Sequence, residues 1–349
     1  MNGTTRRYEP FHRSECQSYK RSMRNTQQKH TMSMKRPNSK SLREKQKRKS
    51  FSPSKNSSKV GDYILTDVNI SSCLCKAVHE NTGREYMCQY IEMSKYRETL
   101  LPYTLVSPNE NINNIVEVLF GKSYVYFIFE RSFGDLHSYI RSKKKLREGE
   151  ACKLFQQIVQ VVRHCHSKGV VIRDLKLRKF VFADPNRTRL KLETLDSAHI
   201  VDKDSTDILH DKHGCPAYVS PEILESTVGY SSKAADVWSL GVIIYTLLTG
   251  RYPFHDHDPT ALFVKIKSGL FIVPETLSAS ASCLIHSILR KPPTERLTAE
   301  ELADHPWFNL DFDTIGATSA SRLGRTKFDQ LVPDLSLSNA PFVFGQMRY

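Results

Sequence analysis

The sequence lacks several features that would place it in a functional class at once. No apolar run among its 349 residues approaches the roughly 20 needed to cross a bilayer, and its start has no secretory apolar core. Its eight cysteines include no CxxC pair and no histidines at zinc-finger spacing. We therefore expect no membrane partner, no metal site and reduced, mostly buried thiols in an intracellular protein.

Acidic residues are also scarce in the first part of the chain. Residues 1–59 carry 17 Lys or Arg against three Glu, whereas residues 60–349 carry 34 residues of each sign. The whole excess of 14 positive charges therefore lies in a polar stretch with few aliphatic side chains. We expect this stretch to be a disordered basic tail. A nucleic-acid binder that uses the tail is one alternative, but the balanced charge of the remainder argues against direct binding of nucleic acid.

Four cations form a compact cluster in this tail: Lys45, Lys47, Arg48 and Lys49. Such a cluster is typical of nuclear import, and a merely solvated run of charge is the alternative. Ser50 and Ser52 follow it directly, and a phosphate on either one would offset nearby positive charge. The Arg- and Ser-rich start also imitates a mitochondrial presequence, but two early glutamates and the lack of an amphipathic stripe disfavour one. We expect the protein in the nucleus and the cytoplasm.

The hydrophobic pattern changes along the chain from strand spacing to helical spacing. Residues 63–91 read as strands with a reversal near Gly83, and residues 124–129 form an aromatic and β-branched strand. Residues 149–167 and 234–248 repeat their apolar side chains at helical spacing. This order predicts a two-lobed α+β fold. The expected parts are a small β-rich N-lobe, about 60–130, a larger helical C-lobe, about 131–308, and a flexible tail, 309–349.

Three stretches of the C-lobe resemble protein kinases. Residues 170–180 are similar to the kinase catalytic loop, residues 213–222 to the end of the activation segment, and residues 236–241 to the motif that follows it. The similarity extends over residues 60–308. It implies a protein-kinase-like fold, whose activity has to be judged from the remaining catalytic residues.

The resemblance assigns structural roles to several of these residues. Asp236 would accept hydrogen bonds from backbone amides of the catalytic loop, and Glu222 would form a buried bidentate pair with Arg296. In a degenerate loop, Asp174 would cap backbone amides and Arg173 would brace the activation segment. These roles argue for the fold and not for catalysis.

The N-lobe lacks the groups that hold phosphate in kinases. Phosphoryl transfer needs a glycine-rich loop and a third-strand lysine with a glutamate partner. Residues 69–75 contain no glycine, and the lysine position holds Gln89, a neutral amide that cannot offset the charge of phosphate. Glu98 is the sole reasonable candidate for the glutamate, on a short helix that Pro102 should end.

The C-lobe lacks both expected magnesium ligands. Thr194 stands at the aspartate of the Asp-Phe-Gly motif, and Lys179 stands at the catalytic-loop asparagine, so that a cation replaces a cation ligand. Only Asp174 and Lys176 remain of the catalytic set. Removing one electrostatic stabiliser commonly lowers a rate by about 10²–10³. We therefore expect no efficient kinase chemistry, and binding of magnesium-ATP that is absent or weak.

Two alternatives retain some chemistry. Asp196 or Glu193 would bind a metal while Lys179 holds phosphate, since residues 194 and 196 face one side of an extended backbone. The other alternative is a weak, atypical Ser/Thr protein kinase that acts through Asp174.

Five stretches narrow the resemblance further: residues 134–142, 174–182, 211–219, 250–256 and 305–308. In them the chain most closely resembles the Tribbles pseudokinases. Gln89 is a departure, because Tribbles proteins usually keep the third-strand lysine. The resemblance implies a non-catalytic scaffold that docks other proteins.

The C-terminal tail indicates which proteins these are. Asp329, Gln330, Val332 and Pro333 match a Tribbles motif, Asp-Gln-x-Val-Pro, that docks on a ubiquitin ligase of the constitutively photomorphogenic type. The Val-Pro pair offers a preordered apolar anchor for a pocket. The resemblance implies that the pseudokinase domain docks a CCAAT/enhancer-binding transcription factor, which the ligase then marks for degradation.

The resemblance implies two further properties. Tribbles proteins bind MAP kinase kinases through the tail and restrain MAP kinase signalling, although here only the general position of the tail matches. By analogy with the family, the aromatic segment at residues 342–344 is predicted to fold back on the domain when no ligase is present. We expect a monomer.

Overall fold

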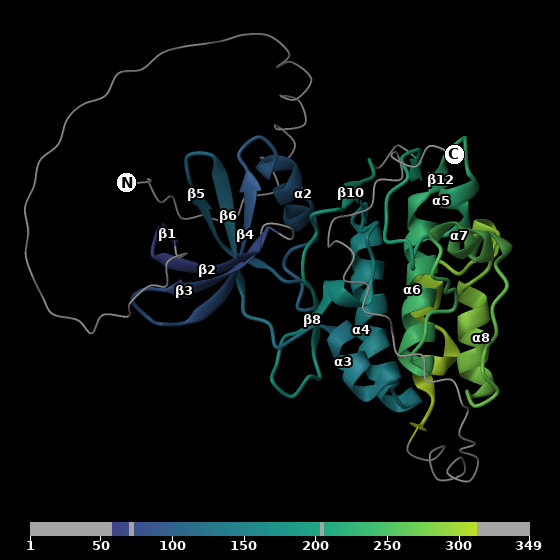
Figure 1. Ribbon diagram of the computed structural model, residues 1–349. Coiled ribbons are helices and arrows are strands. Elements are labelled where there is room, and N and C mark those ends of the chain that lie inside the picture. The colour runs from purple at the N-terminus through teal and green to yellow at the C-terminus, as the bar shows by residue number, and fades with distance from the viewer. Residues whose placement is uncertain (1–57, 70–72, 203–205, 313–349) are drawn as a thin grey trace, which may run out of the picture.

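The computed structural model describes residues 58–69, 73–202 and 206–312. A curled β-sheet with one helix forms the N-lobe, and a bundle of helices forms the C-lobe beside it (Figure 1). The predicted two-lobed α+β fold is therefore confirmed. The described fold is slightly wider than the predicted 60–308, because the first strand begins at Ser58 and Phe312 packs against Trp307 with ring centroids 5.8 Å apart.

The N-lobe sheet has six antiparallel strands in the spatial order β1-β2-β3-β4-β6-β5. Their bounds are β1 Ser58–Val60, β2 Tyr63–Asn69, β3 Leu74–His79, β4 Glu85–Glu92, β5 Ile115–Phe120 and β6 Tyr124–Glu130. The expected reversal joins β3 to β4, where Gly83 has a φ of 68° that L-residues rarely adopt. Alternate side chains of β3, such as Cys75 and Ala77, point to one face of the sheet and are buried there. The predicted strands are confirmed.

The helix of the N-lobe corrects one prediction. We expected it to end near Pro102, but α2 runs over Tyr96–Val106 with Pro102 inside it. The last turn buries Tyr103 and Val106, which are 2% and 1% exposed. Packing of this apolar turn offsets the hydrogen bond that proline cannot donate, because tertiary contacts stabilise most helices in proteins more than local propensity does.

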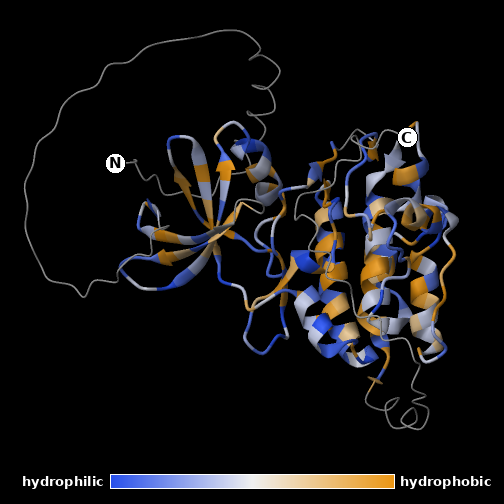
Figure 2. Ribbon diagram, viewed as in Figure 1, coloured by the Kyte–Doolittle hydropathy of each residue, from blue (hydrophilic) through white to orange (hydrophobic). Residues whose placement is uncertain are grey.

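The C-lobe is built around one almost fully buried helix, α6, at Ser232–Thr249. It buries 15 of its 18 residues, and Figure 2 shows hydrophobic residues along much of its length. The other helices are α3 Leu136–Lys143, α4 Glu148–Ser167, α5 Pro221–Glu225, α7 Pro259–Ser268, α8 Ala279–Ile288 and α9 Ala299–Ala303. The helices predicted at 149–167 and 234–248 are confirmed.

Three short strand pairs in the described chain flank the loops of the C-lobe. They are β7 Val170–Val171 with β10 His199–Ile200, β8 Phe180–Phe182 with β9 Leu190–Leu192, and β11 Ile208–Leu209 with β12 Tyr230–Ser231. The 3-10 turns are η1 Leu177–Lys179, η2 Pro293–Glu295 and η3 Pro306–Asn309. The pairs β7–β10 and β8–β9 fix the two ends of the loop that resembles a catalytic loop. No helix of the described residues is both long and apolar enough to span a membrane.

Candidate functional site

Asp236 on α6 holds the loop between β7 and β8 through hydrogen bonds to its backbone. The two oxygens of this carboxylate accept hydrogen bonds from the backbone amides of Ile172 and Arg173, both at 2.8 Å. Nε2 of His166 lies 3.0 Å from Oδ2 of the same group. Asp236 is 1% exposed, and several polar partners offset the cost of burying its charge. The two backbone contacts are those that the sequence led us to expect, whereas the contact with His166 was not predicted.

A second buried charge, Arg296, joins the end of the activation segment to α6. Nη1 and Nη2 of Arg296 donate to Oε1 and Oε2 of Glu222 at 2.8 and 3.2 Å, the expected bidentate pair. The guanidinium also donates to the carbonyl oxygens of Ala234 and Arg290 and lies 5.1 Å from the Trp238 ring centroid. It has no exposed surface. Such a pair is geometrically specific and strongly destabilising to break.

Arg173 links the loop to the activation segment. Its guanidinium forms an ion pair with Asp211, so that Arg173 braces this segment as expected. The hydroxyl of Tyr230 donates to the carbonyl oxygen of Asp211 at 2.9 Å. Arg173 has a φ of 69°, which is strained for a side-chain-bearing residue. The hydrogen bond from its backbone amide to Asp236 and the ion pair with Asp211 hold it there.

Asp174 differs from the prediction. Its Oδ2 accepts a hydrogen bond from Nζ of Lys176 at 2.7 Å, while Oδ1 is buried without a hydrogen-bond partner among the described residues. Within the described residues the carboxylate therefore does not cap backbone amides, because the retained lysine takes one oxygen and no described group bonds to the other. The residue is only 3% exposed, so this unsatisfied acceptor carries a desolvation cost.

The two replaced magnesium-ligand positions meet in one closed network. Nζ of Lys179 donates to Oγ1 of Thr194 at 2.7 Å and forms an ion pair with Oδ1 of Asp196. The Thr194 hydroxyl donates to the same Asp196 oxygen at 2.8 Å. Residues 194 and 196 thus face one side, as predicted, but they hold the ammonium of Lys179. Burial raises the pKa of the Asp196 carboxyl, but the charge and hydrogen bonds of Lys179 and Thr194 outweigh it and lower the pKa overall.

Glu193, the other carboxylate weighed as a metal ligand, is poorly suited to that role. Burial raises its pKa to about 7, opposed by Lys179 and assisted by the charges of Asp135 and Asp196. Near neutral pH it is therefore only partly ionised. Magnesium needs hard anionic oxygens in a near-octahedral array. One nearby carboxylate is neutralised by Lys179 and the other is half protonated, so these residues do not fit the ion. Within the described residues, no group of three His, Cys, Asp or Glu side chains is arranged to hold a metal.

The N-lobe side of the site is equally incomplete. Gln89 on β4 is 4% exposed, and its Oε1 has no hydrogen-bond partner in the part of the chain that the structure describes. Glu98 lies in the first turn of α2 and is exposed, so it does not accompany Gln89 into the interior. Of the loop at 69–75, residues 70–72 lie outside the described residues.

Tyr103 is a residue of this region that the sequence did not reveal. The backbone amide of Leu195 donates to its hydroxyl at 3.0 Å, which ties the segment 194–196 to α2. Burial raises the pKa of the phenol well above its usual range, so the hydroxyl stays neutral. A tyrosine after a proline gave no sign of this contact, because the contact depends on the helix continuing past Pro102.

Several predicted site residues lie outside the described residues. They are the nuclear-import cluster Lys45, Lys47, Arg48 and Lys49, the tail motif Asp329, Gln330, Val332 and Pro333, and the aromatic segment 342–344.

Comparison with known proteins shows the family to which the chain belongs. Residues 70–308 match the protein kinase domain family. The chain is 54% identical over 279 residues to Tribbles homolog 2 of Mus musculus, an alignment that covers 80% of each protein. It is 51% identical over 277 residues to Tribbles homolog 1 of Homo sapiens, covering 79% of this chain and 73% of that protein. Identity to Tribbles homolog 3 of Mus musculus is 48% over 276 residues, covering 79% and 77%. The chain belongs to the Tribbles family of protein-kinase-like proteins.

Proposed function

We propose that this protein is a non-catalytic scaffold that recruits other proteins. The observation that carries the proposal is the network of Lys179, Thr194 and Asp196. Its ammonium lies against the hydroxyl of Thr194, which stands where a kinase presents a magnesium-binding carboxylate, and against the neighbouring carboxylate of Asp196. Two like charges a few ångströms apart repel strongly in a poorly solvated site, so Lys179 excludes the metal on which phosphoryl transfer depends.

The preserved half of the kinase signature supports the same proposal. Asp236 and the Glu222–Arg296 pair hold the catalytic loop, the activation segment and α6 together through side chains that touch no substrate. Their presence keeps the C-lobe folded as a rigid surface. A rigid surface without phosphate chemistry is what a docking protein requires.

The tail motif extends the proposal to an adaptor. Asp329, Gln330, Val332 and Pro333 would bind the propeller of a ubiquitin ligase of the constitutively photomorphogenic type, while the pseudokinase domain docks a CCAAT/enhancer-binding transcription factor for degradation. MAP kinase kinases are the second class of partner, through which the protein restrains MAP kinase signalling. The support is the family membership together with the sequence match in the tail.

The scaffold is tested by measuring labelled phosphate transfer and thermal stabilisation by ATP, each with and without magnesium. We expect no transfer and no magnesium-dependent rise in Tm. Transfer that disappears in an Asp174→Asn variant would instead establish the second candidate, a weak Ser/Thr kinase. That candidate is favoured by one observation, the buried Oδ1 of Asp174 that has no partner among the described residues and would accept a substrate hydroxyl.

The adaptor is tested by capturing the ligase propeller with the full chain. A variant with Val332→Ala and Pro333→Ala should lose binding, because it removes the apolar anchor. A matched control with Leu335→Ala and Pro341→Ala removes similar groups from the same tail and should bind like the wild type. Equal binding by all three proteins would refute the docking motif and leave the pseudokinase lobes as the scaffold.

A further inference from the structure

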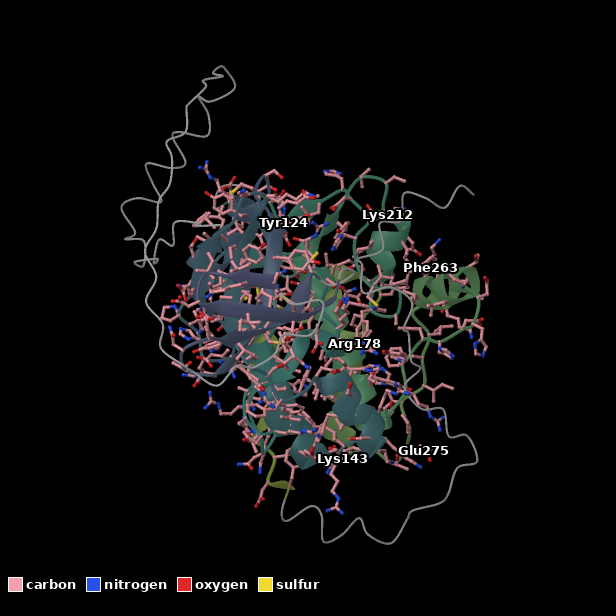
Figure 3. All side chains as sticks on the ribbon, turned by 60° about the vertical axis from the view of Figure 1, so that its left-hand side comes forward. Tyr124, Lys143, Arg178, Lys212, Phe263 and Glu275 are labelled. Carbon is pink, nitrogen blue, oxygen red and sulfur yellow. The ribbon has the colours of Figure 1, made fainter. Side chains whose placement is uncertain are left out.

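The last turn of α3 and the segment that joins it to α4 carry an unusual density of positive charge. The residues are Arg141, Lys143, Lys144, Lys145 and Arg147, here named the basic turn, and all five are exposed. Within residues 139–150 cations outnumber carboxylates by three, although residues 60–349 as a whole are balanced. Figure 3 shows Lys143 at the lower edge of the C-lobe, far from Tyr124 in the N-lobe.

The backbone of the basic turn is clamped to α6. The buried Leu146 donates its amide to the carbonyl oxygen of Leu247 at 2.9 Å. Lys144 adopts a φ of 70°, and a Cβ atom at Gly250 would lie 2.0 Å from its carbonyl oxygen. This close approach is available only to glycine. The cations therefore project from a fixed backbone, which lowers the entropy cost of binding.

A second element adds charge beside the basic turn. Arg187, in the turn between β8 and β9, places its guanidinium 5.5 Å from the ring centroid of Tyr139. Nζ of Lys143 lies 5.6 Å from the same centroid. Cations from two separate turns thus share one aromatic ring, whose negative face offsets part of their mutual repulsion.

The nearby carboxylates are engaged with other groups. Glu148 accepts hydrogen bonds from the amide and hydroxyl of Ser278 at 2.8 and 2.7 Å and from the Trp307 indole at 3.2 Å. Glu150 accepts from the Tyr139 hydroxyl at 2.6 Å. Asp184 accepts from the backbone amides of Thr188 and Arg189 in its own turn. These bonds engage the nearby carboxylates within the fold or within their own turn, whereas the five cations of the basic turn are exposed.

We propose that the basic turn with Arg187 is a docking surface for an acidic segment of a partner protein, rich in Asp and Glu. An extended segment spaces its carboxylates by about 3.3 Å per residue, which suits several exposed ammonium groups along a turn. Such complementarity supplies orientation and a fast on-rate more than raw affinity. The surface shares no residue with the network at Lys179 or with the tail motif.

Other anionic partners fit less well. Single-stranded nucleic acid binds by stacking bases on aromatic faces, but cations already lie over the Tyr139 ring and its hydroxyl is bonded. A membrane-binding surface needs apolar side chains to insert. Leu146 is buried, and the exposed large apolar residues of the described chain lie elsewhere, on β5, β6, β11, α7 and the loops after α5 and α7.

The test measures binding of a labelled ten-residue polyglutamate peptide to the full chain by fluorescence anisotropy. A Lys143→Glu, Lys145→Glu variant is compared with a Lys122→Glu, Lys153→Glu variant, whose exposed lysines lie on the β5–β6 turn and on α4. Both variants change the net charge equally and both keep the basic N-terminal tail. We expect the first to weaken binding about tenfold and the second about twofold or less. Acylation mass spectrometry of the wild type should show the peptide protecting Lys143 and Lys145.

Two results would overturn the proposal. Equal weakening by the two variants, without protection of Lys143 and Lys145, would mean that the peptide responds only to overall charge. Stronger protection of these lysines by a ten-nucleotide single strand or by anionic phospholipid vesicles would assign the surface to a different class of partner.

Discussion

Two regions of the C-lobe differ in how their buried polar groups are paired. In the region that holds the fold together, Asp236 and the Glu222–Arg296 pair have hydrogen-bond partners matched to their charge. In the region that would perform chemistry, Oδ1 of Asp174 has no partner among the described residues, and the ammonium of Lys179 is neutralised by its neighbour. The difference shows which half of the kinase signature still has a physical task. The fold needs the first region for its stability, whether or not the protein transfers phosphate.

The largest expected effect is in the structural region. Glu222→Ala leaves the fully buried guanidinium of Arg296 without a counter-charge, and it should lower the free energy of unfolding by about 3–5 kcal/mol. Urea denaturation measures this. The control is Glu300→Ala, which removes the exposed partner of Arg163 at 3.4 Å and should cost less than about 1 kcal/mol. Similar losses in the two variants would remove the basis for separating the regions.

The next effect is a gain in stability in the chemical region. Burial raises the pKa of Glu193 to about 7 in the fold, whereas it is about 4.3 in an unfolded chain. The unfolded state therefore releases its proton first, and the fold loses stability as pH rises from about 4 through 7. Glu193→Gln removes this loss. Relative to the wild type, the variant should gain about 2 kcal/mol between pH 5 and pH 8.

Urea unfolding at the two pH values measures the change, with the exposed Glu98→Gln variant as the control. A difference from the wild type that stays constant with pH would show that Glu193 is not buried as a neutral acid.

A smaller gain is expected at Gln89. Its Oε1 is buried without a partner in the described residues, so Gln89→Met, a substitution of similar volume, removes an unsatisfied acceptor. The variant should be as stable as the wild type or up to about 1 kcal/mol more stable. Thermal unfolding of both proteins provides the measurement. A large loss of stability would indicate that the amide holds its strand in place, as Asp236 holds its loop.

The smallest effect concerns the ion pair of Lys179 and Asp196. The pKa of Asp196 is lowered in the fold, so its contribution is present above the unfolded pKa, about 3.9, and is lost as pH falls through the folded pKa. The Asp196 side chain is 41% exposed, and solvent screens the pair. Asp196→Asn should therefore cost about 0.5 kcal/mol at pH 7, and this cost should disappear once the pH falls below the folded pKa of Asp196. A double-mutant cycle with Lys179→Gln measures the coupling, and zero coupling at pH 7 would contradict the network.

The sequence predicts the structural region well because its residues lie in motifs that resemble those of protein kinases. Helical spacing predicted α4 and α6, and the resemblance to protein kinases identified Glu222, Asp236 and Arg296 as structural charges. The missing magnesium ligands were also readable, since the absence of a residue type needs no coordinates. A site built from such motifs can largely be predicted from the sequence alone.

The remaining features depend on contacts between distant segments. The continuation of α2 past Pro102 results from the burial of Tyr103 and Val106, which no local rule contains. The bond from Lys176 to Asp174 and the protonation of Glu193 depend on how tightly the loops pack. The basic turn was visible as a run of letters, but its clamp to α6 was not.

Helix α6 also serves as a ruler between two surfaces. Near its start, Asp236 fixes the loop of Asp174, and near its end Leu247 fixes the basic turn. Eleven residues of helix separate these two points, a distance of about 16 Å at 1.5 Å per residue. An extended peptide covers that length with about five residues. A partner that contacted both the loop of Asp174 and the basic turn would therefore need a linker of at least that length between its two contacts. The length of α6 sets this minimum.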